Sequence, residues 1–153
     1  MNGNTKKVLS RLQAQCAKRE YCSQDITEKA LKALDGDREE AAEVLESLIS
    51  DGYVSDMRYA GAFAREKASL TGWGPVKIRY ALAARHIPRE TIDGALAGIE
   101  DDKAGARLRT ILEARWKTLK DDPQGKLKLI RFALGRGYEY DGIRDAVEEL
   151  TRN

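Results

Sequence analysis

Residues 51–78 read DGYVSDMRYAGAFAREKASLTGWGPVKI and contain the densest turn chemistry of the chain. The Gly-Tyr pair at residues 52–53 is typical of the end of one helix, and Ser-Asp at residues 55–56 is typical of the start of the next. Gly-Trp-Gly-Pro at residues 72–75 marks a further turn. Between these turns, half-buried side chains recur at the four-residue spacing of a helix face. The stretch therefore predicts the end of one helical unit and the beginning of another.

Composition favours a helical protein that buries a core. Of the 153 residues, 42% are hydrophobic, 34% are charged and only three are proline, which leaves the chain rich in helix-forming residues. No apolar run approaches the roughly 18 residues that span a membrane, and the N-terminus does not resemble a signal peptide. Two cysteines six residues apart, Cys16 and Cys22, do not make a disulfide framework. We expect a cytoplasmic protein with no membrane partner.

A repeat of about 51 residues runs through the chain. Ala41, Ile92 and Ile143 are 51 residues apart, and other apolar positions recur at nearly the same interval. Each copy is predicted to hold three helices. The expected architecture is therefore all-α, an elongated and curved molecule of three tandem three-helix repeats. We predict that the repeats occupy residues 1–52, 53–102 and 103–153.

Several residues have local signals for helix ends. Ser23 and Asp37 are expected N-caps, and Gly52 is expected to adopt the left-handed conformation that ends a helix. Pro75 suits a first helical turn. The third copy is predicted to open near Lys103.

Charge is segregated along the chain although the net charge is only +2. The middle helix of each predicted copy is rich in lysine and arginine, and the third helix is rich in acidic residues, among them Glu39, Glu90, Glu100 and Glu149. Stacked copies would have one basic and one acidic edge, although charged helix faces often serve only to solvate a protein. The candidate contacts for a partner are Arg58, Arg65, Lys67, Lys77, Arg79, Arg85, Arg89, Lys126, Lys128 and Arg131.

The aromatic residues near the basic stretch have two interpretations. Tyr53, Tyr59, Phe63 and Trp73 are expected to pack between copies one and two, since aromatic side chains dominate cores. Alternatively, these rings and Tyr80 stack on bases while the arginines bind phosphates.

The sequence contains no catalytic constellation. His86 lies in a predicted turn without a nucleophile beside it, and His86, Cys16 and Cys22 lack the spacing of a metal site. The glycines at residues 72–74 lack the Gly-Lys-Ser/Thr ending of a phosphate loop. We expect no catalytic residue, no metal and no cofactor, and hence no enzyme.

The chain resembles the RecX family of regulators of the bacterial RecA recombinase. The family signature reads Gly-Tyr-Leu-Asp-Asp-x-Arg-Phe-Ala and then Gly-Tyr-Gly-Pro-x-x-Ile. This chain departs from it at Val54-Ser55, Tyr59 and Trp73, and His86-Ile87 stands where the family prefers Gly-Ile. The resemblance spans nearly the whole chain and is strongest over residues 45–96. The motif positions, expected to be structural, are Gly52, Tyr53, Asp56, Tyr59, Phe63, Gly72, Trp73, Gly74, Pro75, Ile78 and Leu82.

The resemblance implies a monomeric protein that binds within the groove of the RecA–DNA filament. Bound there, it would inhibit RecA by lowering ATP hydrolysis, strand exchange and co-protease activity. The basic residues would meet acidic RecA surface or DNA. Two alternatives stay open, namely a helical module that binds DNA without RecA and a scaffold for an unrelated protein.

Overall fold

The computed structural model describes the backbone of residues 1–99 and 101–152, and the side chains of all of these except 101–104. Glu100, which the sequence groups with the acidic third helices, lies outside the described residues. The described chain forms nine α-helices and no strand, which confirms the all-α prediction. In chain order they are α1 (Gly3–Lys18), α2 (Ser23–Ala33), α3 (Arg38–Ser50), α4 (Asp56–Leu70), α5 (Pro75–Ala84), α6 (Arg89–Ala97), α7 (Asp101–Leu119), α8 (Gly125–Gly135) and α9 (Tyr140–Thr151).

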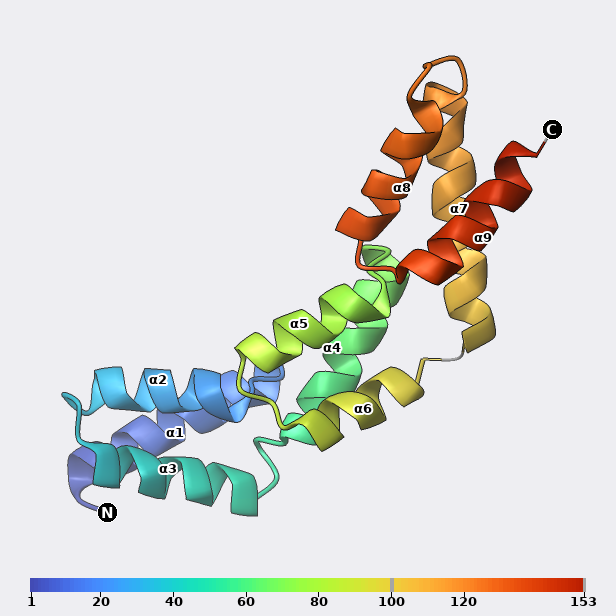
Figure 1. Ribbon diagram of the computed structural model, residues 1–153. Coiled ribbons are helices and arrows are strands. Elements are labelled where there is room, and N and C mark those ends of the chain that lie inside the picture. The colour runs from blue at the N-terminus through green and yellow to red at the C-terminus, as the bar shows by residue number, and fades with distance from the viewer. Residues whose placement is uncertain (100, 153) are drawn as a thin grey trace.

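The helices form three successive groups, which we call repeat 1 (α1–α3), repeat 2 (α4–α6) and repeat 3 (α7–α9). Figure 1 shows the groups arranged as a bent, elongated staircase with the two chain ends far apart. The middle helices α2, α5 and α8 follow one edge of the staircase, and α3, α6 and α9 follow the opposite edge. The tandem-repeat prediction is confirmed. The division at residues 52 and 102 stays a prediction, and α7 begins at Asp101, two residues before the predicted start.

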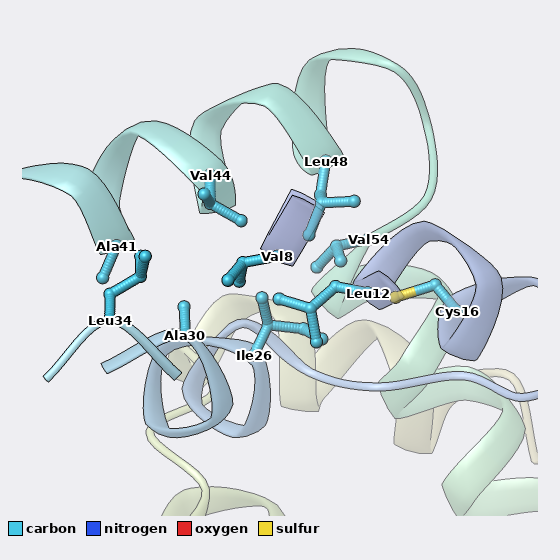
Figure 2. Packing of buried hydrophobic residues seen from close by; sticks show 10 residues of the cluster. All are labelled: Val8, Leu12, Cys16, Ile26, Ala30, Leu34, Ala41, Val44, Leu48 and Val54. Atoms are coloured by element: carbon cyan, nitrogen blue, oxygen red, sulfur yellow. The ribbon is translucent and has the colours of Figure 1, made fainter. Parts of the chain in front are cut away.

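Each repeat has a hydrophobic core of its own. In repeat 1, Leu12 of α1 and Ile26 of α2 point toward Val44 and Leu48 of α3 (Figure 2). Ile78 and Leu82 hold the corresponding place in repeat 2, and Leu129 does so in repeat 3, all with no exposed surface. Each such side chain stabilises the fold by about 1.5–3 kcal/mol. The repeated apolar positions in the sequence are therefore core positions.

Most of the predicted helix ends are confirmed. Asp37 accepts a hydrogen bond from the Glu40 amide at 3.1 Å, and Ser55 accepts one from the Arg58 amide at 3.2 Å. Gly52 has a φ of +80°, in the left-handed region where a side chain would be strained. Pro75 occupies the first turn of α5.

Ser23 is not the N-cap that the sequence predicts. Cys22 holds that position and makes no capping bond with its side chain. The Ser23 amide instead donates a 2.7 Å hydrogen bond to Oδ1 of Asp56, at the start of α4 in repeat 2. Cys22 itself is fully buried in the core of repeat 2. The α1–α2 turn is thus inserted against the next repeat, and local propensity could not predict a cap that comes from 33 residues away.

The junction of repeats 2 and 3 is made by backbone groups. The amides of Gly74 and Val76, at the start of α5, donate to the carbonyls of Arg136 and Gly137 at 2.7 and 2.9 Å. A Cβ added at Gly74 would overlap the carbonyl of Gly137, and one added at Gly137 would overlap Lys77. Only glycine therefore permits this approach of α5 to the end of α8.

The aromatic residues pack in two places rather than one. Tyr53 packs on the core of repeat 1, whereas Tyr59, Phe63 and Trp73 belong to repeat 2 with successive ring centroids 6.0 and 6.2 Å apart. Tyr59 and Phe63 border a hollow between repeats 1 and 2, as predicted. Trp73 lies at the other end of repeat 2, where it and Tyr138 line a small cavity. Its assignment to the first junction was wrong.

We expect Gly74→Ala to destabilise the protein. Its methyl group would push apart the backbones of repeats 2 and 3, at a cost of about 1–3 kcal/mol for overpacking. Thermal unfolding followed by circular dichroism should show a lowered midpoint. Gly94→Ala is the matched control, because a Cβ at this position in α6 meets nothing within 4 Å and the substitution should stabilise the helix. Equal midpoints for Gly74→Ala and wild type would contradict the close junction.

Cys22 should report the opening of the first junction. In a Cys16→Ala background we expect Cys22 to react slowly with a thiol reagent at pH 8, because burial shields the sulfur and raises the pKa of its thiol. Asp56→Ala removes the carboxylate that caps Ser23, so loss of about 1 kcal/mol should accelerate the reaction roughly fivefold.

Asp37→Ala provides the control for Cys22, since it removes a cap of α3 that lies within repeat 1. It should leave the reaction rate of Cys22 nearly unchanged. Equal acceleration by Asp37→Ala and Asp56→Ala would mean that Cys22 reacts through unfolding of repeat 1 as a whole.

Candidate partner-binding surface

The three middle helices follow one another end to end. The carbonyls of Arg136 and Gly137, directly after α8, accept the amides of Gly74 and Val76 at the start of α5. Arg85, directly after α5, forms an ion pair with Asp25 in the first turn of α2. Lysine and arginine occur on all three helices, and neither α5 nor α8 contains an acidic residue. We call this row, from α8 through α5 to α2, the basic edge (Figure 1).

The opposite edge has the opposite charge. Helices α3 and α9 each contain four acidic residues and one arginine, and α6 contains Glu90 and Asp93. The segregation that the sequence suggests is therefore a property of the folded surface. A long molecule with one basic edge can align with an extended acidic partner, and the field along such an edge is felt over about one Debye length, near 8–10 Å.

Five of the ten predicted contact residues have structural partners. Arg58 is the most engaged: its Nε donates to both oxygens of Glu20 at 2.7–2.8 Å, and its Nη2 donates to the carbonyls of Gly52 and Tyr53. This arginine joins α4 to repeat 1. The other three ion-paired residues are Arg79 with Asp93, Arg85 with Asp25 and Lys128 with Asp122. The fifth, Lys77, reaches toward the Gly135 carbonyl at 3.4 Å across the second junction.

Lys67 and Lys77 share an aromatic neighbour. Their ammonium groups lie 4.9 and 4.6 Å from the centroid of the Trp73 ring. A cation over an indole face is attracted by the ring quadrupole, by about 0.5–1 kcal/mol at an exposed site. Both lysines therefore help to hold Trp73 in place, and their charge still reaches solvent.

The other four predicted residues are exposed and form no ion pair with any side chain that the structure describes. They are Arg65, Arg89, Lys126 and Arg131. Lys126 and Arg131 belong to α8, on the basic edge. Arg65 belongs to α4, which packs against α5, and Arg89 belongs to α6, which follows the opposite edge (Figure 1). The fold thus brings together the predicted residues of α5 and α8, whereas Arg65 and Arg89 belong to other helices.

The folded chain forms a cationic hollow at the first junction that the sequence does not indicate. It has a volume of about 300 Å³, and Arg85, Lys29 and Lys32 line it together with Arg19 and Tyr21. The Arg19 guanidinium lies 4.4 Å from the Tyr21 ring centroid, and the Lys29 ammonium lies 5.0 Å from it. Asp25 and Glu28 also border the hollow. Arg19 and Tyr21 lie just after α1, outside any periodic pattern, so only the folded chain reveals them.

The described residues offer little for chemistry. Burial raises the pKa of both thiols, Cys16 and Cys22, which makes them poor nucleophiles at neutral pH. His86 lies in the α5–α6 turn with a φ of +62°. Within the part of the chain that the structure describes, no three His, Cys, Asp or Glu side chains gather where they could hold a metal ion. Over the same residues, none of the helices has the length and apolar character that crossing a bilayer requires.

Two regions of the chain match family models. Residues 55–96 match RecX, second three-helix domain, and residues 102–147 match RecX, third three-helix domain. The chain belongs to the RecX family. These regions coincide with repeats 2 and 3 as the structure defines them, and they contain both α5 and α8.

Named relatives agree with this assignment. The Regulatory protein RecX of Chromohalobacter salexigens is 29% identical over 90% of this chain and 88% of its own length. That of Pseudomonas putida is 30% identical over 83% of this chain and 80% of its own. A crystal structure of RecX from Lactobacillus salivarius superposes with a TM-score of 0.87 at 20% identity, covering 98% of both chains, and supports the fold. The relatives' names give the chain a regulatory role.

Proposed function

We propose that this protein regulates RecA, mainly as an inhibitor, by lying in the groove of the RecA filament on DNA. It would lower ATP hydrolysis, strand exchange and co-protease activity without catalysing a reaction itself, and would act as a cytoplasmic monomer. The proposal rests on membership of the RecX family. The observation that supports the mechanism is the basic edge of an elongated molecule, because α5 and α8 contain lysine and arginine without a carboxylate and the row continues onto α2, where Asp25 and Glu28 balance two lysines.

The shape and the charge favour groove binding over contact at a single point. Closely packed junctions keep successive repeats at defined angles, so several contacts form together once the first is made. Each contact then benefits from a high effective concentration of the next. Attraction through lysine and arginine also speeds association, and it should weaken as salt is raised. Occupancy of the groove would obstruct the changes of filament geometry that ATP turnover and strand exchange require.

Direct binding of DNA is the second candidate function. The cationic hollow at the first junction favours it, since Arg19 and Lys29 lie over the ring of Tyr21 and Lys32 lines the same hollow. Single-stranded nucleic acid is commonly bound by such a combination of cations and an aromatic side chain. In this case the protein would shift a DNA oligonucleotide in a gel as strongly without RecA as with it.

We expect charge reversal on the basic edge to weaken inhibition. Arg131→Glu should raise the concentration that half-inhibits the DNA-dependent ATPase of the cognate RecA by about fivefold or more, as loss of a complementary charge does at other interfaces. Arg131 is preferable to Arg79 and Arg85, whose ion pairs with Asp93 and Asp25 would be broken by the same substitution.

Arg144→Glu is the matched control for Arg131→Glu. It makes the same change of charge on α9, at an exposed position on the acidic edge, where Arg144 makes a long, solvent-exposed contact of 3.6 Å with the adjacent Asp145. It should leave the half-inhibiting concentration within about twofold of wild type. If wild-type protein has no effect on the cognate RecA at any concentration, the proposed function is wrong.

A further inference from the structure

Helices α5 and α8 expose apolar side chains among their basic residues. The exposed fractions are 49% for Val76 and 79% for Tyr80 on α5, and 45% for both Leu127 and Leu134 on α8. Among the described residues, these are four of nine large hydrophobic side chains that are strongly exposed. Two short helices thus hold nearly half of that group. Scattered exposure needs no explanation, but a concentration of this kind indicates an interaction site.

These side chains point directly away from the cores of their repeats. On α5, Val76 and Tyr80 are one helical turn apart and lie opposite the buried Ile78 and Leu82. On α8, Leu127 and Leu134 lie on either side of the exposed Arg131, opposite the buried Leu129. Val76 and Leu127 are 51 residues apart, the interval of the repeat. Both repeats therefore present the same outward face.

The two outward faces adjoin each other. The amide of Val76 donates to the carbonyl of Gly137, three residues after Leu134, so the end of α8 touches the beginning of α5. The two helices follow the same edge of the molecule in Figure 1. We give one name, the outer strip, to the exposed residues Leu127, Arg131 and Leu134 of α8 together with Val76 and Tyr80 of α5.

The outer strip does not continue onto α2. The corresponding positions there, 52 residues before Val76 and Tyr80, are Gln24 and Glu28. Their side chains bond to each other, from Nε2 of Gln24 to Oε1 of Glu28 at 3.2 Å. The outward face of α2 is therefore polar, and its two side chains bond to each other. The apolar character is specific to repeats 2 and 3.

We propose that the outer strip docks an acidic surface of a partner protein that presents apolar side chains between its carboxylates. This inference rests on the proposed function, in which that surface belongs to the RecA filament. Tyr80 and Arg131 are residue types enriched at the energetic centres of interfaces, and the aliphatic side chains beside them exclude water from such a centre. We expect the partner to be acidic, because α5 and α8 contain no carboxylate and their exposed Lys126 and Arg131 form no ion pair with any described side chain, although Arg79 and Lys128 pair with Asp93 and Asp122 of neighbouring segments.

The aliphatic residues favour protein over nucleic acid as the occupant. Phosphates and sugars offer valine and leucine no apolar surface to bury, and stacking on bases uses aromatic rings and guanidinium planes. Tyr80 alone could stack in this way. Val76, Leu127 and Leu134 gain the most free energy where a partner covers them with apolar side chains.

Binding of wild type and a Tyr80→Ala variant to the cognate RecA, assembled on single-stranded DNA, tests the proposal. We expect Tyr80→Ala to raise Kd about tenfold or more, and Leu127→Ala to raise it several-fold, as at other interface centres. Both side chains are exposed, so the unfolding midpoint should not change. Tyr140→Ala is the matched control, because this tyrosine is 52% exposed at the start of α9 and should be dispensable.

The same proteins should be measured against the bare oligonucleotide. If wild type binds the filament and neither Tyr80→Ala nor Leu127→Ala changes Kd, the docking role of the outer strip is wrong and the proposed function stands. Equal weakening by Tyr80→Ala on the filament and on bare DNA would overturn that role too, because the strip would then be a nucleic-acid surface. Failure of wild type to bind the filament at all would overturn both the strip and the proposed function.

Discussion

The first amides of a helix need acceptors that the helix itself cannot provide. In this protein the next repeat provides them. Asp56 of repeat 2 accepts from the Ser23 amide of α2, and the carbonyls of Arg136 and Gly137 in repeat 3 accept from the Gly74 and Val76 amides of α5. A requirement of α2 and of α5 is thus met only when the repeats are joined. The junctions are consequences of helix geometry, and the end-to-end order of α8, α5 and α2 depends on them.

The two junctions meet this requirement by different means. The first uses charged side chains, with Arg58 on Glu20 and Arg85 on Asp25 beside the Asp56 cap. The second uses backbone carbonyls at a separation that only glycine permits. The residue with positive φ after the middle helix also differs. After α8, at the close second junction, it is Gly137. After α5, where side chains mediate the contact to repeat 1, it is His86, with φ of +62°.

Sequence reasoning succeeded where the signal was local. The 51-residue interval of apolar residues predicted the repeats, and Asp37, Gly52 and Pro75 marked helix ends correctly, because caps and turns involve neighbours in the chain. It failed where the partner was distant. Nothing near Ser23 indicates that its acceptor is Asp56, and nothing near Arg58 or Arg85 distinguishes an arginine that joins repeats from one that awaits a partner.

The sequence does not reveal the outer strip, for a related reason. Val76 and Leu127 are ordinary apolar residues in a helical sequence, and only the folded chain shows that their neighbours Ile78 and Leu129 are buried in the cores while they themselves are exposed. The basic residues of the same helices were recognised because charge is visible without a structure. What the fold adds is their arrangement: α5 and α8 are held end to end, so that charge and apolar surface from two repeats act as one face toward a partner.

Amide hydrogen exchange at Gly74 and Val76, measured residue by residue in the isolated protein, tests the trans-capped junction most directly. Both amides precede the first hydrogen bond within α5 and would exchange freely if repeat 3 did not accept them. The structure predicts protection comparable to that of the amide of buried Ile78. Exchange as fast as that of the Thr91 amide, at the start of α6 where no side chain caps the helix, would contradict the account.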